Sequence, residues 1–287
     1  MAEPAHIHVS RGPAGHARST PPEGGSALLR LGTATAWRDD SLQTTLRLLG
    51  EGGAVGRILL HSARSEISVP ADAPDPGQDV HFMLTVSSAL LLARRERALI
   101  HAASVAPPGG PAILLTGDAR AGKSTTTANL VACGWDYLSD DQVVLSWEAV
   151  ATEEPCTPRV EGWLRTFHLD RGWREGRVTG QRTDVDPTSL GGSHRRQAPL
   201  GGLLFPFLEP GRPTALHRVT SADALARLMR QSPWLFADPV VAGAALERLR
   251  RVAQLPAHVL RLGMDVYRDP ARLGRLLEPV VLEMGTP

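Results

Sequence analysis

The sequence predicts an α/β fold, and three observations support that prediction. The apolar run Ala112 to Thr116 has the length and composition of a buried strand. The loop Gly117 to Gly122 follows it directly, and a helical segment then runs from about Lys123 to Cys133. A second apolar segment, Val143 to Trp147, supplies the next strand. Strand, loop, helix and strand in this order is the layout that a phosphate-binding loop requires.

Composition sets limits on the class of protein. The chain has 287 residues, of which 42% are hydrophobic, enough for a sizeable core in one large or two small domains. Basic and acidic residues number 31 and 30, so no overall charge attracts nucleic acid or an anionic membrane. The two cysteines, Cys133 and Cys156, lie in no CxxC or Cys/His pattern, so neither a disulfide framework nor a zinc site is indicated.

No segment has the pattern of a membrane anchor or a signal peptide. The longest apolar run, Phe82 to Ala93, is too short to cross a bilayer, and Ser87 and Ser88 interrupt it. The N-terminal residues lack the basic and then apolar order of a signal peptide. We therefore expect a cytoplasmic protein with no membrane partner and no nucleic-acid partner.

Local patterns divide the chain into three parts. Residues 1–25 are rich in Pro, Gly, Ala and His, and we expect a flexible tail. Residues 26–97 are expected to form a small N-terminal β-rich lobe, closed by a helix from Val80 to Arg97. Residues 98–287 are expected to form the phosphate-loop core with C-terminal helices. The strands expected in the lobe are residues 28–31, 44–49 and 57–60, with a loop at 71–77.

The core contains further predicted elements on both sides of the loop. A strand is expected at Ala98 to Val105 before it, and another at Leu203 to Leu208 after it. Helices are expected at Ser221 to Arg230, Pro239 to Gln254 and Pro270 to Leu277. Residues 150–198 are polar and rich in Arg and Gly, and the pattern assigns no element to them.

The loop matches the pattern Gly-x-x-x-x-Gly-Lys-Ser in full. Its glycines allow successive backbone N–H groups to turn inward, and these donors and the start of the following helix hold phosphate oxygens. Lys123 is expected to reach the β- and γ-phosphates, and Ser124 to bind Mg²⁺. The alternative is a glycine-rich turn that fits the pattern by chance. The expected nucleotide-binding residues are Gly117, Asp118, Ala119, Arg120, Ala121, Gly122, Lys123, Ser124 and Thr125.

The lysine of this loop is the only lysine in the chain, since every other one of the 31 basic residues is arginine. A bias of this kind is typical of a GC-rich genome, in which Arg replaces Lys wherever the exchange is tolerated. A compact ammonium on a flexible stem fits a phosphate loop, and a planar guanidinium does not. The retention of Lys123 therefore supports the assignment of the loop.

Two adjacent carboxylates, Asp140 and Asp141, precede the strand at Val143. One carboxylate in this place can orient Mg²⁺, while the other accepts a proton from an attacking hydroxyl. The alternative is a polar turn between helix and strand, because Asp is common in turns. The pair therefore predicts a site role for at least one of the two carboxylates, Asp140 or Asp141.

Three of these segments resemble a known family. His101-Ala-Ala-Ser-Val, Gly117-Asp-Ala-Arg-Ala-Gly-Lys-Ser and Leu138-Ser-Asp-Asp-Gln-Val look like the core of HPr kinase/phosphorylase and its wider group of HPr-kinase-like kinases. The resemblance is specific over His101 to Val144 and weak elsewhere. It implies an α/β phosphate-loop kinase core of the HPr kinase/phosphoenolpyruvate carboxykinase type, with ATP and Mg²⁺ as cofactors.

The resemblance also assigns roles to single residues. Asp141 matches the aspartate that accepts the proton, Lys123 the phosphate lysine, and His101 a histidine of the active site, which would otherwise be a buried strand histidine. Glu161 is the nearest candidate for a further metal ligand beside Ser124 and Asp140, although Arg159-Val-Glu-Gly-Trp163 departs from the usual signature. Arg195 or Arg196 is a candidate to hold the transferred phosphoryl group, with solvated arginines as the alternative.

The implied activity is the transfer of the γ-phosphoryl group of ATP to a hydroxyl, with a serine of a peptide or protein as acceptor. The weak match after Val144 indicates an acceptor other than HPr, such as a ribosomally made peptide. Three alternatives stay open: a kinase of a small metabolite such as free serine, an ATPase without phosphoryl transfer, and a nucleotide-gated peptide-binding module. The Asp140–Asp141 pair favours a kinase over a hydrolase, and the sequence leaves homo-oligomerisation undecided.

Overall fold

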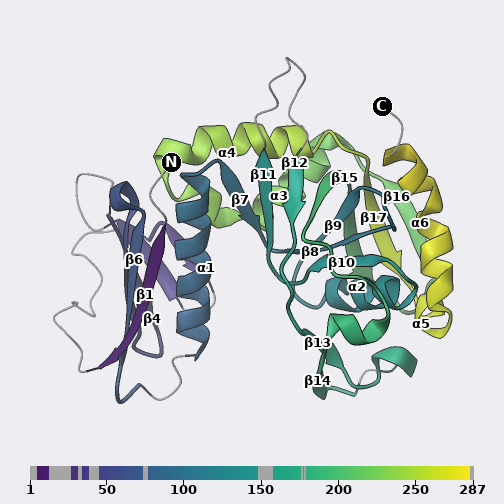
Figure 1. Ribbon diagram of the computed structural model, residues 1–287, viewed down its shortest axis with the longest axis horizontal. Helices are drawn as coiled ribbons and strands as arrows, with labels where there is room; N and C mark the ends of the chain where they lie inside the picture. The colour runs from purple at the N-terminus through teal and green to yellow at the C-terminus, as the bar shows by residue number, and fades with distance from the viewer. Residues whose placement is uncertain are drawn as a thin grey trace. The chain divides into compact units, whose positions relative to one another are not determined.

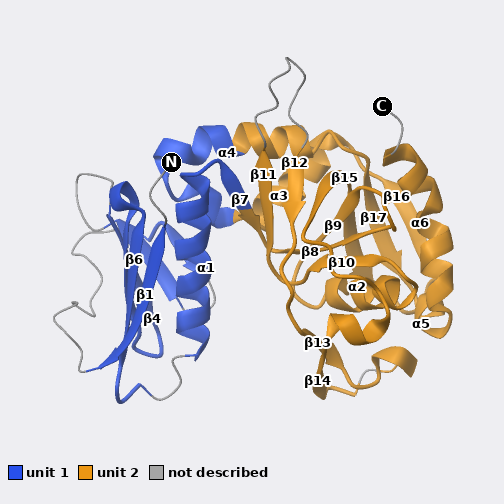
Figure 2. Cartoon of the chain, viewed as in Figure 1, with its two compact units in different colours: residues 1–98, 233–245 blue, residues 99–232, 246–287 orange. Residues whose placement is uncertain are grey.

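The computed structural model describes residues 5–12, 27–31, 34–38, 45–73, 77–147, 158–175, 177 and 179–284. The chain forms two compact units, with residues 1–98 and 233–245 in unit 1 and residues 99–232 and 246–287 in unit 2 (Figure 2). The sequence places residues 233–245 in the core instead. They belong to unit 1 because Ala237 is part of its apolar core and Asp238 pairs with Arg94, contacts between distant segments that no local pattern reveals.

Unit 1 is built on a sheet with the strand order β1-β6-β5-β4-β3-β2, against which helix α1 packs (Figure 1). Strand β1 runs parallel to β6, and the other neighbouring strands are antiparallel. Buried apolar side chains of the sheet and of α1, among them Leu46, Ile58 and Met83, form its core. The elements are β1 (His6–Gly12), β2 (Leu29–Leu31), β3 (Ala34–Arg38), β4 (Thr45–Gly50), β5 (Val55–Leu59), η1 (Leu60–Ser62), β6 (Arg64–Pro70), α1 (Gly77–Ala93) and η4 (Pro233–Phe236).

Strand β1 lies inside the segment for which the sequence predicts a flexible tail. Its side chains are mostly exposed, so the segment shows no alternation of apolar and polar residues. The strand exists because its backbone pairs in parallel with all seven residues of β6, from Arg64 to Pro70. Such pairing depends on a distant partner and leaves no local trace. The rest of the predicted tail lies outside the described residues, except for Ala5.

Unit 2 contains a mixed sheet with the strand order β10-β8-β9-β15-β12-β11-β7, extended by β17 and β16 beside β15. Strand β9 lies between β8, which is antiparallel to it, and β15, which is parallel. All five residues of β9 are buried, which explains the unbroken apolar run of its sequence. The strands are β7 (Arg97–Ile100), β8 (Ala102–Ala106), β9 (Ala112–Thr116), β10 (Asp136–Ser139), β11 (Val143–Trp147), β12 (Pro158–Glu161), β13 (Phe167–Asp170), β14 (Arg182–Val185), β15 (Gln197–Leu208), β16 (Ala215–Arg218) and β17 (Ala257–Leu262).

Helices cover the sheet of unit 2. Helix α2 packs on β8, β9 and β10 and contacts α6, which also packs on β15 (Figure 1). Leu130, Leu260 and Leu277 are among the buried side chains of this core. None of the helices in the described part of the chain has the length and hydropathy needed to span a bilayer. The helices are α2 (Lys123–Ala132), η2 (Trp173–Glu175), η3 (Pro187–Leu190), α3 (Ser221–Arg230), α4 (Pro239–Val252), which runs from unit 1 into unit 2, α5 (Asp265–Arg268) and α6 (Pro270–Met284).

The structure confirms a mixed α/β architecture and corrects two details of the core. The single strand predicted at Ala98 to Val105 is two strands, β7 and β8, which separate at His101. β7 is hydrogen-bonded to β11, whereas β8 pairs with β9 and β10. Both strands are largely buried, so the apolar run is continuous and no change in periodicity marks the break. In the segment without predicted elements, residues 158–185 contain β12 and the antiparallel pair β13 and β14.

Candidate functional site

The phosphate-loop pattern occupies the turn between β9 and α2. Arg120 and Gly122 both adopt left-handed backbone conformations, with φ of +65° and +100°. The φ of Gly122 is one that L side chains rarely adopt, so the backbone favours glycine there, and a Cβ atom would also lie 2.7 Å from Leu262 Cδ1. Helix α2 begins at Lys123, and the free N–H groups of its first turn face the loop end. This arrangement is a ready binding site for an anion.

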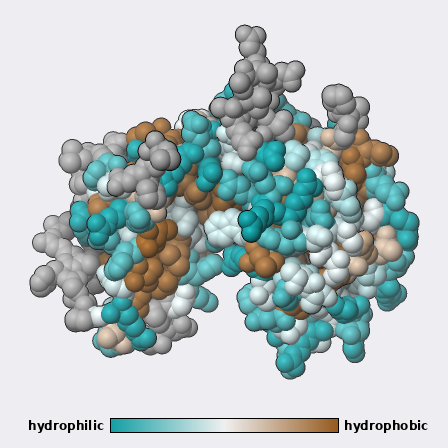
Figure 3. Space-filling model, in the orientation of Figure 1, coloured by the Kyte–Doolittle hydropathy of each residue, from teal (hydrophilic) through white to brown (hydrophobic). Residues whose placement is uncertain are grey.

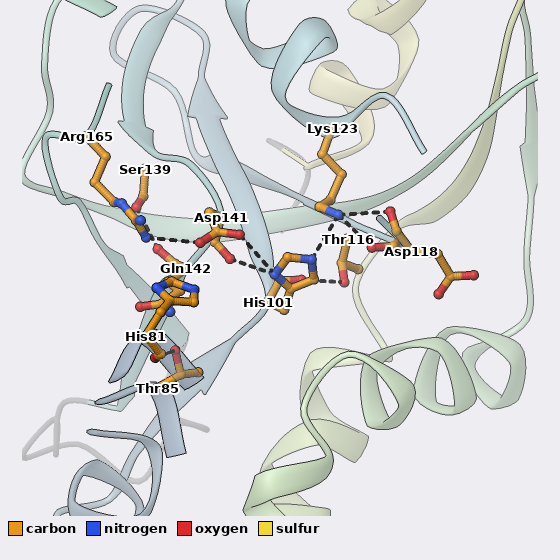
Figure 4. Close-up of polar contacts among 11 residues, drawn as sticks. His81, Thr85, His101, Thr116, Asp118, Lys123, Ser139, Asp141, Gln142 and Arg165 are labelled. Carbon is orange, nitrogen blue, oxygen red and sulfur yellow. Dashed lines mark hydrogen bonds and ion pairs between the residues drawn. The ribbon is translucent and has the colours of Figure 1, made fainter. Parts of the chain in front are cut away.

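The side chain of Lys123 is buried and folded back over its own loop. Its Nζ atom donates to Gly117 O at 2.7 Å and to Asp118 O at 3.1 Å, and it lies 3.1 Å from His101 Nε2 (Figure 4). Burial lowers the pKa of this ammonium, while the negative charges of Asp140, Asp141 and Asp118 act in the opposite direction. The two backbone hydrogen bonds therefore hold the Lys123 nitrogen at the centre of the loop, where burial makes its proton easier to lose.

His101 connects the lysine to Asp141. Its Nδ1 atom lies 2.9 Å from the backbone oxygen of Asp141 and 3.4 Å from the carboxylate Oδ1 (Figure 4). An ammonium can only donate, so Nε2 accepts from Lys123 and Nδ1 carries the hydrogen that it donates to Asp141. His101 is the single residue between β7, which ends at Ile100, and β8, which begins at Ala102. The change of strand at this residue places its side chain here.

Asp140 is a buried carboxylate with an unused oxygen. It accepts hydrogen bonds from the Ser124 side chain and from the backbone of Asp141, but no described residue bonds to its Oδ1 atom. Burial raises the pKa of Asp140, the hydrogen bond from Ser124 opposes that shift, and the charge of Asp141 adds to it. A buried carboxylate oxygen without a partner is costly unless a cation or a donor occupies the site.

Asp141 sits in a strained turn. Its φ is +67°, and the backbone N–H of Gln142 donates to Asp140 O at 2.8 Å, which closes a three-residue turn of the rare positive-φ type. The hydroxyl of Ser139 donates to Gln142 O at 2.6 Å and braces the turn. The side chain of Asp141 remains about one-third exposed. Strain of this kind is typical of functional sites.

Arg165 completes this cluster, and the sequence analysis did not identify it. Its Nη1 atom donates to Asp141 Oδ2 at 3.2 Å (Figure 4). Its backbone oxygen accepts a hydrogen bond from the buried Tyr137 hydroxyl at 3.1 Å, and the Tyr137 ring packs edge-on against Phe167. No signal distinguishes Arg165 in the sequence, because arginine is abundant and 24 positions separate it from Asp141.

The loop is also tied to the end of α3. The side-chain amide of Gln231 donates to Asp118 Oδ1 at 2.8 Å, and its backbone oxygen accepts from the N–H of His101 at 3.1 Å. Gln231 therefore holds both the loop and the histidine. The Asp118 carboxylate accepts the bond from Gln231, and its backbone oxygen accepts a bond from Lys123. Both groups of Asp118 therefore stabilise the loop.

Two other predicted residues are Arg195, which precedes β15, and Glu161, which lies on β12. Arg195 donates to Gly110 O at 2.6 Å, before β9 begins, whereas the phosphate loop follows the end of that strand. The five residues of β9 separate its start, where Arg195 binds, from the phosphate loop at its end by about 15 Å. The prediction that Arg195 holds the transferred phosphoryl group is therefore wrong. Glu161 ends β12, opposite Val144 and Gln197. Among the described residues no three His, Cys, Asp or Glu side chains form a metal-binding group, so Glu161 does not join the aspartate pair in one.

A cavity of about 470 Å³ lies beside the phosphate loop. Gly122, Lys123, Ser124 and Thr125 form one wall, and the others come from the region of β13 and β14, from the end of β15 and from α5. Leu169, Trp173 and Tyr267 give it apolar and aromatic surface, and Arg120, Arg177 and Arg182 give it positive charge. On the face shown in Figure 3, hydrophilic side chains cover the end of unit 2 where β13 and β14 lie. The volume is in the range of small-ligand sites.

Comparison with known proteins gives little. No family model matches the chain, and no curated protein matches it. One solved structure similar to it is that of the HPr(Ser) kinase/phosphatase from Coxiella burnetii, with 13% identity and a TM-score of 0.36. The match covers 66% of this chain and 99% of that one. A likeness this distant assigns neither fold nor function, so the function rests on the residues of the chain itself.

Proposed function

We propose that this chain is an ATP-dependent phosphotransferase that moves the γ-phosphoryl group to a hydroxyl, with a serine of a peptide or protein as the acceptor. The observation that carries the proposal is the convergence of three separate segments: the phosphate loop, His101 and the aspartate pair. Lys123 contacts His101, His101 contacts the half-buried Asp141, and the buried Asp140 has a free oxygen beside Ser124 at the start of α2. Phosphate, metal and proton can be handled side by side there.

The nucleotide is assigned to the loop and the neighbouring cavity. Backbone N–H groups of the loop and of the first turn of α2 bind phosphate oxygens, and Lys123 supplies a positive charge. The cavity begins at Ser124 and Thr125 and offers Trp173 and Tyr267 as flat apolar surface. A nucleoside linked to phosphates on the loop fits this combination of walls.

Magnesium fits the residues at the start of α2. Asp140 offers a buried oxygen that no described residue uses, and the Ser124 hydroxyl lies next to the same carboxylate. Mg²⁺ prefers oxygen ligands and usually keeps water and phosphate oxygens in its shell, so one carboxylate and one hydroxyl are a sufficient protein contribution. When bound, the ion neutralises charge on the phosphates. A contribution of Glu161 beside Ser124 and Asp140 stays a prediction, because the group that is absent among the described residues is one of three His, Cys, Asp or Glu side chains.

Asp141 is assigned as the proton acceptor. As the hydroxyl oxygen forms its bond to the γ-phosphorus, the bond from that phosphorus to the β–γ bridging oxygen breaks, and its electron pair stays on ADP. The hydroxyl proton passes to Asp141. Arg165 and His101 hold the carboxylate in place, and Lys123 stabilises charge on the transferring group. Positioning and electrostatics supply most of the catalysis in a reaction of this type.

The proposal is tested by a transfer assay. The protein is incubated with γ-labelled ATP, Mg²⁺ and a panel of serine-containing peptides, free serine and other small hydroxyl compounds, in parallel with Lys123→Ala. We expect label in an acceptor with the wild type and none with the variant. Phosphate release without a labelled acceptor would indicate an ATPase, and ATP binding without turnover would indicate a binding module. Either result contradicts the proposal.

A further inference from the structure

Two large apolar side chains are exposed next to the residue that holds Asp141. Trp163 is 39% exposed and Leu164 is 54% exposed, and both directly precede Arg165 in the connection between β12 and β13. Single exposed apolar residues are ordinary on protein surfaces, but adjacent ones beside a polar site indicate an interaction surface. We call Trp163 and Leu164 the apolar step.

The backbone of the apolar step is fixed on both sides. The N–H of Gly162 donates to Arg196 O at 2.6 Å, and the N–H of Trp163 donates to Leu138 O at 2.7 Å. After the step, Arg165 O accepts the hydrogen bond of the Tyr137 hydroxyl. A Cβ atom at position 162 would lie 2.3 Å from Arg195 O, so this close approach requires glycine. The segment is thus anchored, while its two apolar side chains face outward.

The anchoring places the apolar step within a few residues' reach of the candidate proton acceptor. The Arg165 guanidinium contacts Asp141, and Leu164 and Trp163 follow backward along the chain at about 3.8 Å between successive Cα atoms. An extended peptide advances about 3.3–3.6 Å per residue. Trp163 N–H also bonds to Leu138 O, only three residues before Asp141, so a side chain one to three residues from a hydroxyl held at Asp141 is within reach of the step.

We propose that the apolar step selects acceptors: it takes a peptide with an apolar side chain one to three residues from the phosphorylated serine. This inference rests on the proposed phosphotransferase function and narrows its acceptor to a peptide. Free serine ends at its own carboxylate and amine, so it leaves Trp163 and Leu164 in water. The continuous run from Asp141 through Arg165 to the step favours a peptide over a small metabolite.

The test uses a positional library of short serine peptides. In each set one position within three residues of the serine is fixed as Leu, Phe, Ala, Lys or Glu, and the others are mixed. The wild type is expected to phosphorylate the Leu or Phe set at one position at least about tenfold faster than the Ala set, since burying one apolar side chain changes kcat/KM by that factor or more. The ratio of rates is measured within each protein, so differences in total activity cancel.

Three variants complete the experiment. Trp163→Ala with Leu164→Ala is expected to bring the Leu-to-Ala ratio close to one. Leu164→Glu is expected to move the preference at the same position from Leu to Lys, a gain that a misfolded protein cannot produce. Leu282→Ala removes an apolar side chain that is 74% exposed on α6, and it is expected to keep the wild-type ratio. Circular dichroism checks that each variant is folded.

The outcomes distinguish a failure of the proposed acceptor selection by the apolar step from a failure of the proposed phosphotransferase function. Transfer to peptides without an apolar preference overturns the role of the step and leaves the proposed function standing. The same holds for a preference that survives both replacements. Transfer to free serine alone overturns the step and the peptide acceptor, and leaves the phosphotransferase activity standing. Absence of transfer to every hydroxyl compound, whether or not ATP binds, overturns the proposed function and the step with it.

Discussion

Two buried aspartates, one in each unit, differ in how their charge is compensated. Asp238 in unit 1 is fully buried, and its carboxylate receives two hydrogen bonds from Arg94, at 2.6 and 3.2 Å. The N–H of Val240, at the start of α4, donates to it as well. Asp140 in unit 2 is nearly as buried, yet its Oδ1 atom has no partner among the described residues.

The difference separates a structural carboxylate from one that we propose to be functional. A buried charge with a complete set of partners fixes its surroundings, and removing it leaves the partner charge without compensation. A buried carboxylate with an empty oxygen raises the free energy of the folded chain until something binds there. Asp140 therefore marks the place where the chain gives up stability for a ligand, as functional sites often do.

The largest effect is expected next to Asp140, at Asp141. We predict that Asp141→Asn keeps ATP affinity and lowers the rate of phosphoryl transfer by about 10²- to 10⁴-fold, because an amide cannot accept the hydroxyl proton. The loose transition state of the reaction favours the lower end of that range. Titration of ATP and single-turnover rates measure the two quantities separately. If ATP affinity falls together with the rate, Asp141 holds the metal, and its assignment as proton acceptor fails.

The second effect is on stability, at Asp238. We predict that Asp238→Ala lowers the free energy of unfolding by about 3–5 kcal/mol, since it leaves the largely buried Arg94 guanidinium without its partner. Urea denaturation of variant and wild type gives the change. A loss below 1 kcal/mol would show that this pair contributes no more than a surface ion pair, and the contrast between the two aspartates would disappear.

The matching change at Asp140 is expected to have the opposite character. Asp140→Ala removes a buried charge whose Oδ1 atom no described residue compensates, so the free energy of unfolding without ligand is expected to stay within about 1 kcal/mol of the wild type or to rise. The Mg²⁺-dependent part of ATP affinity is expected to fall by about 10- to 100-fold. The same urea titration, repeated with Mg²⁺ and ATP, measures both. A destabilised variant with unchanged Mg²⁺ dependence would make Asp140 structural.

An exposed aspartate, Asp170, should give the smallest effect. It accepts hydrogen bonds from the backbone N–H groups of Gly172, Thr179 and Gly180. These bonds, above all the one from Thr179, lower the pKa of Asp170 to about 2. Because the unfolded chain binds the proton more readily, the stabilisation is present above pH 3.8 and is lost as the pH falls through about 2. The N–H shifts of Thr179 and Gly180 should therefore titrate near pH 2, and Asp170→Asn should remove that titration. A midpoint near 3.8 would contradict the contacts.

The strand, turn and helix from β9 to α2 could be predicted from the sequence because their information is local. Gly122 is favoured by the backbone itself, the buried strand before the loop shows as an apolar run, and the helix after it starts where the pattern places it. The hydrogen bond between Ser124 and Asp140 joins two distant segments. Each segment is marked in the sequence, Ser124 by the Gly-x-x-x-x-Gly-Lys-Ser pattern and Asp140 by the pair of aspartates before a strand. These features need no knowledge of the rest of the chain.

The missed features all depend on contacts between distant segments. Strand β1 is exposed and exists through its pairing with β6, and the break at His101 follows from the different neighbours of β7 and β8. Arg165 reaches Asp141 from a segment whose strands are four residues long and whose arginines resemble one another in sequence. Arg195 carries the charge that a phosphoryl-binding residue needs, but its position at the other end of β9 depends on the folded sheet.

The central claim is that the loop binds Mg²⁺-ATP through Lys123, and calorimetry tests it most directly. ATP is titrated with and without Mg²⁺ into the wild type, Lys123→Ala and the control Leu282→Ala. Lys123 is the only lysine of the chain, so no other ammonium can replace it. The account predicts Mg²⁺-dependent binding for the wild type and the control, and a loss of ATP affinity of roughly 10- to 150-fold for Lys123→Ala, since a hydrogen bond to a charged group contributes about 1.5–3 kcal/mol. Equal ATP affinity and equal turnover in wild type and Lys123→Ala would contradict it.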